Sequence, residues 1–215
     1  MGTGTVTIDR LVAWLSRFHE LVTEQRGYLT ELDSAIGDAD HGANMDRGMS
    51  AVMDKLGATG AGTVDELFKI VGMTLVTSVG GASGPLYGTF FLRMAPALGS
   101  SDSVDAADFA KALRAGVEGV VQRGRAEAGD KTMFDALAPT LEALDSALAS
   151  GTGLTAALAD ATVAAEKGRD ATESMVARKG RASYLGQRSV GHLDPGAASS
   201  AMLIAAAATA FATSG

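Results

Sequence analysis

The chain has 215 residues, of which 47% are hydrophobic and 20% charged, and its formal net charge is −7 at pH 7. This length and composition are typical of one large globular domain, so we expect a single domain over residues 1–215. The acidic balance argues against a nucleic-acid or anionic-membrane partner, which would need a basic face. Cysteine is absent, which excludes disulfides and thiolate metal sites and fits a reducing compartment.

Targeting and membrane-spanning signals are not evident. The N-terminus lacks a basic stretch followed by an apolar run, which argues against a signal peptide. The most apolar stretch, 201–213, is short and rich in alanine, so we do not expect it to span a bilayer. We therefore expect a cytoplasmic protein.

Apolar residues recur at helical spacing along most of the chain. The first helix is expected over 8–22, with Thr7 as its N-cap and a break at Arg26-Gly27. A short second helix should end at Gly37, in a left-handed cap. Further helices are expected around 45–56, 64–79, 90–98, 109–121, 134–148, 154–165 and 197–213, with a short one at Met175-Val176.

Apart from the two short helices, this pattern amounts to about eight helices and no convincing strand. We therefore predict an all-α fold, an eight-helix antiparallel up-and-down bundle or barrel. Alternate loops of such a fold share one rim. Four loops that carry unusual residues would then gather there: 33–44, 80–85, 124–132 and 178–196.

The first of these loops carries three aspartates, Asp33, Asp38 and Asp40, within eight residues. Carboxylates this close repel one another unless a cation neutralises them, and Mg²⁺ prefers oxygen ligands that include substrate phosphates. An EF-hand does not fit, because its third oxygen ligand would fall on Gly42. The loop therefore indicates a Mg²⁺ site beside a phosphate-bearing ligand, with a plain Asp/Gly turn as the alternative.

Two stretches suit phosphate binding. Residues 41–44 are expected to start a helix, where free backbone N–H groups suit phosphate oxygens. Residues 80–85, Gly-Gly-Ala-Ser-Gly-Pro, let the backbone approach a ligand closely, and Ser83 can serve as an N-cap or a phosphate donor. A plain interhelical turn is the alternative for this second stretch.

The later loops are less decisive. Residues 124–132 nearly match a P-loop, but Asp130 interrupts the motif and no strand precedes it, so we expect Asp130 or Thr132 to cap the next helix instead. Residues 178–181, Arg-Lys-Gly-Arg, form either a ligand-binding cluster or a solvated basic loop. Asp194-Pro195 should begin the last helix, which is apolar nearly all round and should be buried.

Together these motifs resemble the signature of the L subunit of dihydroxyacetone kinase, in order and almost end to end. The matching stretches are L-D-x-x-I-G-D-A-D-H-G-x-N at 32–44, G-G-A-S-G-P-L at 80–86, G-D-K-T-M at 129–133, R-K-G-R-A-S-Y-L-G at 178–186 and D-P-G-A at 194–197. The length resembles the separate subunit of the bacterial, phosphotransferase-dependent enzyme. The resemblance implies an eight-helix barrel that holds ADP or ATP with two Mg²⁺ at one rim.

The resemblance also assigns roles to residues. Asp33, Asp38 and Asp40 would ligate the metals, and Arg181 would be the catalytic residue that stabilises the transferring phosphoryl group. Gly124 and Met133 would lie on the nucleoside side. The full set of nucleotide contacts would be His41, Gly42, Ala43, Asn44, Ala82, Ser83, Gly124, Met133, Arg181, Asp194, Pro195 and Gly196.

By the same resemblance, the subunit is inactive alone. A partner K subunit would hold dihydroxyacetone through a histidine, and an M subunit that carries phosphohistidine would rephosphorylate the bound ADP. Two alternatives stay open: an ATP-dependent kinase of a small ketose with freely exchanging nucleotide, and a nucleotide-loaded regulatory module. Whether the chain also forms a homodimer is left open.

Overall fold

The computed structural model describes residues 5–212. Within them, eight long helices and one short helix, α2 (Arg26–Ile36), account for most of the chain. Two 3-10 segments, η1 (Thr172–Ser174) and η2 (Arg181–Ser189), lie between the last two helices. The long helices are α1 (Ile8–Glu24), α3 (His41–Thr59), α4 (Val64–Ser78), α5 (Ser83–Leu98), α6 (Ala106–Gly124), α7 (Met133–Ala149), α8 (Leu154–Ala171) and α9 (Pro195–Ala212).

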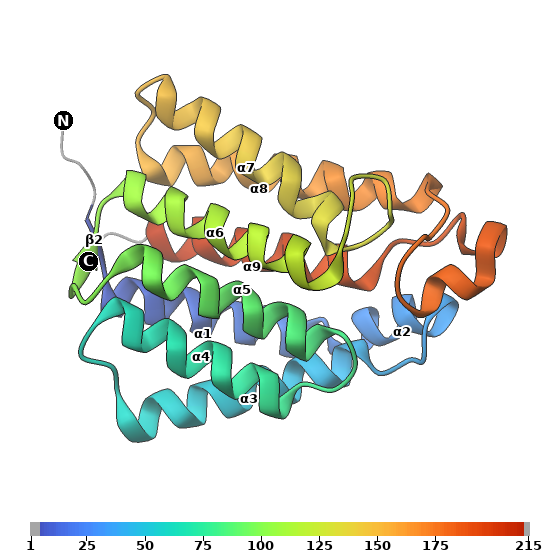
Figure 1. The fold of residues 1–215 in the computed structure, drawn as a ribbon, viewed down its shortest axis with the longest axis horizontal. Coiled ribbons are helices and arrows are strands. Elements are labelled where there is room, and N and C mark those ends of the chain that lie inside the picture. Colours follow the sequence, from blue (N-terminus) through green and yellow to red (C-terminus); the bar gives the residue numbers. More distant parts are fainter. Residues whose placement is uncertain (1–4, 213–215) are drawn as a thin grey trace.

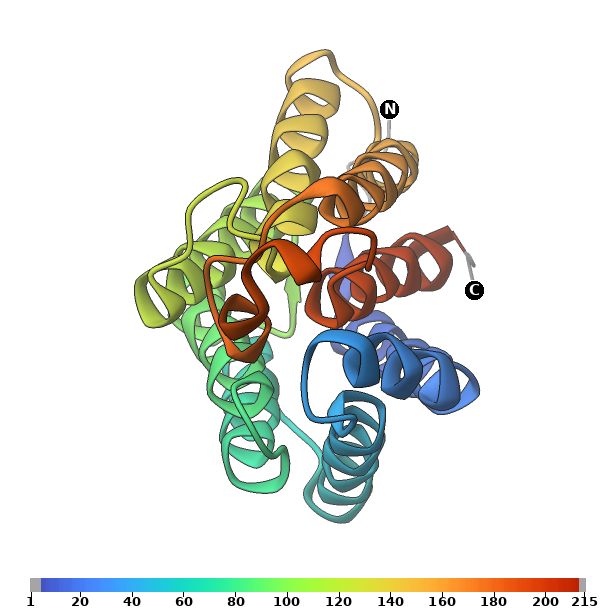
Figure 2. The same cartoon turned by 90° about the vertical axis from the view of Figure 1, so that its right-hand side faces the viewer.

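The eight long helices form a closed ring. Each one packs on the next in chain order, and α9 packs on α1, which closes the ring; Figure 2 views it from one end. Helix α2 lies at that end and contacts α3 and α9, whereas the start of α1 and the end of α9 lie at the opposite end (Figure 1). The predicted all-α, eight-helix barrel is thus confirmed.

An aromatic cluster around Trp14 fills the ring. The indole Nε1 donates a hydrogen bond to the carbonyl oxygen of Leu203 at 2.8 Å. Four buried phenylalanine rings surround it, with centroids 5.6 to 6.3 Å from that of the indole: Phe68, Phe91, Phe109 and Phe211. Because these rings come from α1, α4, α5, α6 and α9, one cluster ties together helices from around the barrel.

Helix starts follow the sequence signals closely. Thr7 accepts a hydrogen bond from the backbone of α1. Thr132 caps α7, in a capping box with Asp135. Asp194 accepts a backbone N–H at 2.7 Å where α9 begins at Pro195. These caps satisfy N–H groups that a helix start leaves without partners.

Several predicted boundaries are wrong. Helix α1 ends at Glu24, with Gln25 as its C-cap, because α2 follows at once and contains Gly27. Gly37 does end α2, but its φ of −137° lies outside the left-handed region. Residues Met175-Val176 are not helical, since η1 ends at Ser174 and Met175 is extended. Ser83 is the first residue of α5 rather than its N-cap.

A short sheet was not anticipated by periodicity. Strand β1 (Val6–Thr7) pairs antiparallel with β2 (Ser103–Val104), and strands of two residues are too short to show alternation.

Helix α9 is 18 residues long with a mean hydropathy of 1.4, so length and composition alone would allow it to cross a membrane. It is 67% buried inside the structure, which confirms the predicted core helix.

Helices α4 and α5 approach each other closely at two glycines. A Cβ atom on Gly72 would lie 2.8 Å from the carbonyl oxygen of Gly88 and 2.6 Å from Cγ of Leu92. A Cβ atom on Gly88 would lie 2.9 Å from the carbonyl oxygen of Gly72. All three distances are shorter than van der Waals contact, so any larger residue must push the helices apart.

We expect Gly72→Ala to lower the free energy of unfolding by about 1–3 kcal/mol through overpacking. Gly57→Ala is the matched control, because Gly57 lies in α3 and a Cβ atom there would meet none of the described residues within 4 Å. It should gain up to ~1 kcal/mol from helix propensity. Urea unfolding followed by circular dichroism measures both, and equal stability of the two variants would contradict the close packing.

Candidate functional site

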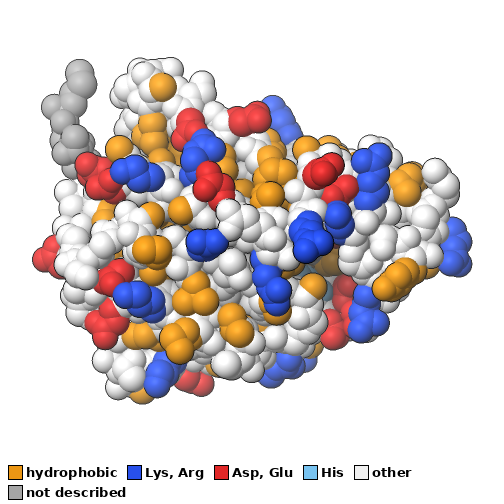
Figure 3. Space-filling view, in the orientation of Figure 1, with side chains coloured by type: hydrophobic (Ala, Val, Ile, Leu, Met, Phe, Trp, Pro, Cys, Tyr) orange, Lys and Arg blue, Asp and Glu red, His pale blue; other side chains and the backbone are white. Residues whose placement is uncertain are grey.

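A pocket of about 410 Å³ opens at the end of the ring where α2 lies. It is lined by residues from four stretches far apart in the sequence, within 33–41, 80–87, 120–133 and 179–196. The expected gathering of four loops at one rim is therefore confirmed. Segment η2 crosses this end of the ring (Figure 2), and Lys and Arg side chains gather around a hollow in the right-hand half of the molecule (Figure 3).

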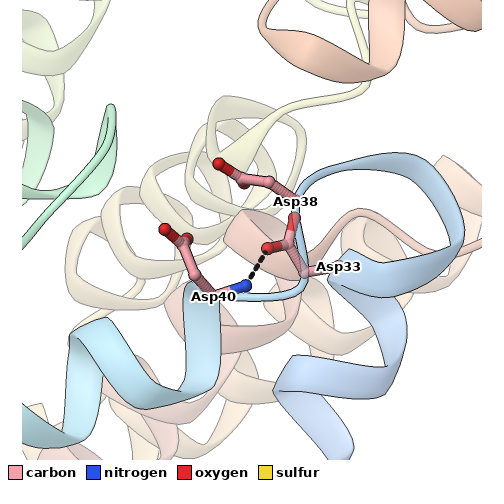
Figure 4. Close-up of side chains that lie close together, drawn as sticks. All are labelled: Asp33, Asp38 and Asp40. Carbon is pink, nitrogen blue, oxygen red and sulfur yellow. Dashed lines mark hydrogen bonds between the residues drawn. The ribbon is translucent and has the colours of Figure 1, made fainter.

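Asp33, Asp38 and Asp40 lie together at the edge of the pocket, where α2 passes into α3 (Figure 4). One carboxylate oxygen of each lies within 4.8 Å of those of the other two. Asp33 is buried, Asp40 is half-buried and Asp38 is exposed. Three carboxylate oxygens at this spacing fit a hard divalent cation such as Mg²⁺.

The loop backbone holds these carboxylates in place. Oδ2 of Asp33 accepts hydrogen bonds from the backbone N–H of Asp40 at 2.8 Å and of His41 at 3.1 Å. Ala39 has a φ of 61°, a left-handed conformation that costs a non-glycine residue roughly 1–2 kcal/mol. Gly37 leaves room for the cluster, since a Cβ atom there would lie 2.0 Å from Oδ1 of Asp33. Strain of this kind is typical of functional loops.

His41 is buried beside the aspartate cluster, and each of its ring nitrogens is hydrogen-bonded to a serine hydroxyl group. Nδ1 lies 3.0 Å from Oγ of Ser83, and Nε2 lies 2.9 Å from Oγ of Ser199. The hydroxyl of Tyr87 lies 2.7 Å from the same Ser199 oxygen. Burial lowers the pKa of His41 and raises the pKa of Tyr87 to about 12, so both are neutral near pH 7. The network anchors Ser83 at the pocket wall.

Three of the expected nucleotide contacts, Gly42, Ala43 and Asn44, do not line the pocket. Gly42 packs on α2, where a Cβ atom would lie 2.1 Å from the carbonyl oxygen of Arg26. Asn44 is buried, and a Cβ atom on Gly80 would lie 2.9 Å from its side-chain oxygen. Gly42 and Asn44 therefore pack behind the two phosphate-type loops, a position that sequence spacing does not reveal.

Another part of the lining is apolar. Gly124 and Met133 belong to it, as expected, together with Leu86, Val120 and Ala126. A Cβ atom on Gly124 would lie 3.3 Å from Cδ2 of Leu86, so a side chain here would fill the recess. The pocket thus combines an acidic, metal-type region with a region suited to a flat apolar group.

Basic residues complete the lining. Nε of Arg181 lies 2.9 Å from Oδ2 of Asp38, and its side chain remains 69% exposed. Lys179 and Arg123 also line the pocket. The sequence pointed to Lys179 as part of the basic cluster at 178–181. It gave no indication for Arg123, which looks like an ordinary basic residue in the last turn of a helix.

Asp194 joins the lining at the start of α9, next to Pro195 and Gly196. Burial raises the pKa of its carboxyl group to about 7, and the nearby carboxylates of Asp135 and Asp33 add to this effect. The hydrogen bond from the N–H of Ala197 and the charge of Lys131 oppose it. The group therefore changes protonation near neutral pH.

Comparisons with known proteins agree with this structure. A family model described as the DAK2 domain matches residues 35–209. Over 190 residues, the chain is 47% identical to the PEP-dependent dihydroxyacetone kinase, ADP-binding subunit DhaL, of Escherichia coli (strain K12), covering 88% of this chain and 90% of that protein. Over 198 residues, it is 46% identical to the PTS-dependent dihydroxyacetone kinase, ADP-binding subunit DhaL, of Lactococcus lactis subsp. lactis (strain IL1403), covering 92% and 95%.

A solved structure shows the same fold. The dihydroxyacetone kinase from C. freundii in complex with AMP-PNP and Mg²⁺ matches with a TM-score of 0.71 and 28% sequence identity, over 93% of this chain and 33% of that chain. The chain belongs to the DAK2-domain family and, within it, to the group of DhaL subunits of dihydroxyacetone kinases.

The raised pKa of Asp194 makes stability depend on pH. The folded chain keeps this proton up to about pH 7, whereas an unfolded aspartate loses it near its ordinary value of 3.8. The stability of the fold that depends on a protonated Asp194 is therefore fully present below pH 3.8 and is lost as the pH rises towards 7. Asp194→Asn keeps the cap without the charge. In nucleotide-free protein, the free energy of unfolding of Asp194→Asn should rise relative to that of the parent between pH 4 and 8, by on the order of 2–4 kcal/mol.

Urea unfolding of both proteins at several pH values measures this difference. A difference that stays constant with pH, or that shrinks as the pH rises, would contradict the assignment of a raised pKa to Asp194.

Proposed function

We propose that this chain relays a phosphoryl group from a phosphohistidine donor subunit, through bound ADP, to dihydroxyacetone held on a partner K subunit. The observation that carries this proposal is the cluster of three carboxylates beside a glycine-rich loop and an apolar recess in one pocket. The E. coli and L. lactis relatives are named ADP-binding subunits, and the C. freundii kinase was crystallised with AMP-PNP and Mg²⁺. Nucleotide and magnesium are therefore the ligands that best suit the pocket.

Asp33, Asp38 and Asp40 would hold the magnesium, and we assign two ions to the site. Because these carboxylates converge from one short loop, they could share a pair of cations that nucleotide phosphates complete on the other side. Bound Mg²⁺ would neutralise the phosphate charge and orient the phosphoryl group. Asp33 would have one free oxygen for this purpose, since Oδ2 is taken by two backbone N–H groups.

The rest of the pocket would bind the nucleotide. Ala82 and Ser83 lie at the start of α5, where free backbone N–H groups suit phosphate oxygens. Gly124 and Met133 would contact the nucleoside through the apolar recess, and 194–196 would close the pocket. The volume of about 410 Å³ is within the usual range for such ligands. Gly42, Ala43 and Asn44, together with the ring of His41, would act as support.

Arg181 would be the catalytic residue. Its guanidinium group pairs with Asp38 and is mostly exposed, so it lies beside the proposed metals and next to the surface from which a partner would approach. A guanidinium at this position would stabilise negative charge on the phosphoryl group in transfer.

The resemblance to dihydroxyacetone kinase subunits supports an assembly with partner subunits. The chain would be a single nucleotide-binding domain that is inactive alone, and the K and M subunits would bring the acceptor and the donor to the open end of the pocket. Since its relatives draw on PEP or the PTS, which supply phosphate inside the cell, we place it in the cytoplasm.

Asp38→Asn tests the metal assignment. We expect it to weaken binding of ADP in the presence of Mg²⁺ by roughly 10- to 100-fold, because one metal ligand loses its charge. Binding of ADP without Mg²⁺ should change little. Isothermal titration calorimetry with and without Mg²⁺ measures both quantities. Asp54→Asn, at an exposed position on α3, is the control and should behave like the parent; unchanged Mg²⁺ dependence in Asp38→Asn would remove the metal assignment.

Substitution into the E. coli kinase tests the relay. The chain replaces the E. coli DhaL subunit in an assay with PEP, dihydroxyacetone and the remaining components of that system, and pyruvate formation is followed. We expect activity without added ATP, and a loss of at least 100-fold in Arg181→Ala, because a phosphate-stabilising arginine contributes about 10³–10⁵ in related reactions. Activity that requires added ATP would instead support an exchanging, ATP-dependent kinase.

A further inference from the structure

Lys131 is a buried lysine in the loop between α6 and α7. Its side chain is only 1% exposed and is among the largest fully buried side chains of the described residues. The acceptors of its ammonium group are backbone carbonyls rather than carboxylates. Nζ donates hydrogen bonds to the carbonyl oxygens of Thr172 at 2.8 Å, Ser189 at 2.8 Å, Met175 at 3.2 Å and His192.

All four carbonyls belong to the connection between α8 and α9, which we call the cover segment (residues 172–194). This segment contains η1 and η2 and crosses the open end of the ring in Figure 2. It contributes Lys179, Arg181 and Asp194 to the pocket lining. Its apolar anchoring is slight: Ala177 and Ala182 form a small buried cluster with Ile36, and the partly buried Leu185 packs against this cluster.

The surroundings of the ammonium group resemble a site for a monovalent cation. Backbone carbonyls that converge on one point replace the hydration shell of such an ion, as they do in potassium channels. A protonated amine offers three N–H donors and no acceptor, which suits a cage made only of carbonyl oxygens, two of the four sharing one N–H. Burial lowers the pKa of Lys131, whereas the nearby charges of Asp194 and Glu173 raise it and so favour the protonated form.

The loop that carries Lys131 is shaped for this contact. Lys131 has a φ of 63°, a left-handed conformation that non-glycine residues rarely adopt. The preceding residue, Asp130, also holds the cover segment: its carbonyl oxygen accepts the N–H of Arg178 at 3.0 Å, and its carboxylate lies 4.0 Å from Nζ of Lys179. Two adjacent residues therefore fasten the segment to the loop between α6 and α7.

We propose that Lys131 acts as an internal cation that fixes the cover segment over the pocket and thereby positions Arg181 and Asp194. It is a positioning residue, because its ammonium group contacts the carbonyls of the cover segment. The effect on nucleotide binding rests on the proposed function, whereas the fixing of the segment does not. The same contacts explain why a lysine follows Gly129-Asp130 here, in a stretch that lacks the strand a P-loop requires.

Lys131→Met tests this proposal, since methionine keeps much of the length and removes the charge. Hydrogen exchange is measured by mass spectrometry on peptides that contain Ala177, Arg178 and Gly191, whose amides hold the segment through hydrogen bonds to Ser189, Asp130 and Glu173. We expect at least tenfold faster exchange there and no change in α4 and α5. Lys111→Met, at an exposed site on α6, is the control and should match the parent throughout.

Binding of ADP with Mg²⁺ is measured on the same proteins. We expect the dissociation constant of Lys131→Met to rise by at least tenfold, with Lys111→Met unchanged. If the parent itself fails to bind ADP with Mg²⁺, the proposed function fails, whereas the exchange measurement still tests whether Lys131 fixes the segment.

Chemical rescue separates an internal cation from a general packing role, and it also applies if Lys131→Met folds poorly. Lys131→Ala leaves a space that ethylammonium can enter, and this ion should restore slow exchange in the cover segment in a concentration-dependent way. Tetramethylammonium has no N–H donor and should not.

The proposal is overturned if exchange in the cover segment of Lys131→Met stays within twofold of the parent. It is also overturned if exchange rises equally in all helices and ethylammonium has no effect on Lys131→Ala, because the lysine would then only stabilise the fold as a whole.

Discussion

The structure depends on holding three carboxylates closer together than their mutual repulsion favours. Oxygens of Asp33, Asp38 and Asp40 lie within 4.8 Å of one another at a partly buried position, where water screens their charges poorly. Two backbone N–H groups bind Asp33, Ala39 adopts a left-handed conformation, and Gly37 leaves room beside the cluster. In the function that we propose, a bound cation offsets these costs.

The ring of helices makes such a loop possible. A closed barrel with a filled aromatic centre provides rigid ends, so that loops from distant parts of the sequence can meet with little freedom. Charge is then distributed around the same pocket: Arg181 beside Asp38, a carboxyl group of raised pKa at Asp194, and the ammonium group of Lys131 behind the cover segment. The chain as a whole is acidic, but Lys and Arg side chains gather around the hollow in Figure 3, where they suit a ligand that carries phosphates.

The features that could be predicted from the sequence are those that local spacing determines. Helical periodicity and caps such as Thr132 and Asp194 depend on residues within a few positions of one another, and so does the acidic loop. The roles of Asn44 and Lys131 could not be predicted in this way, because they depend on which distant loop each residue meets. From the sequence, Asn44 was expected to contact the nucleotide, but it lies behind Gly80. Lys131 belongs to a stretch that only nearly matches a P-loop, but its ammonium group contacts four distant backbone carbonyls. Gly27 shows the converse case, since a glycine that suits a helix end lies inside α2.

Anomalous diffraction from crystals grown with ADP and Mn²⁺ tests the central claim most directly, because manganese replaces magnesium and marks its own position. We predict anomalous peaks that are bonded both to the carboxylates of Asp33, Asp38 and Asp40 and to phosphate oxygens of ADP. Bound ADP with manganese elsewhere, or with these three carboxylates facing solvent, would contradict the account.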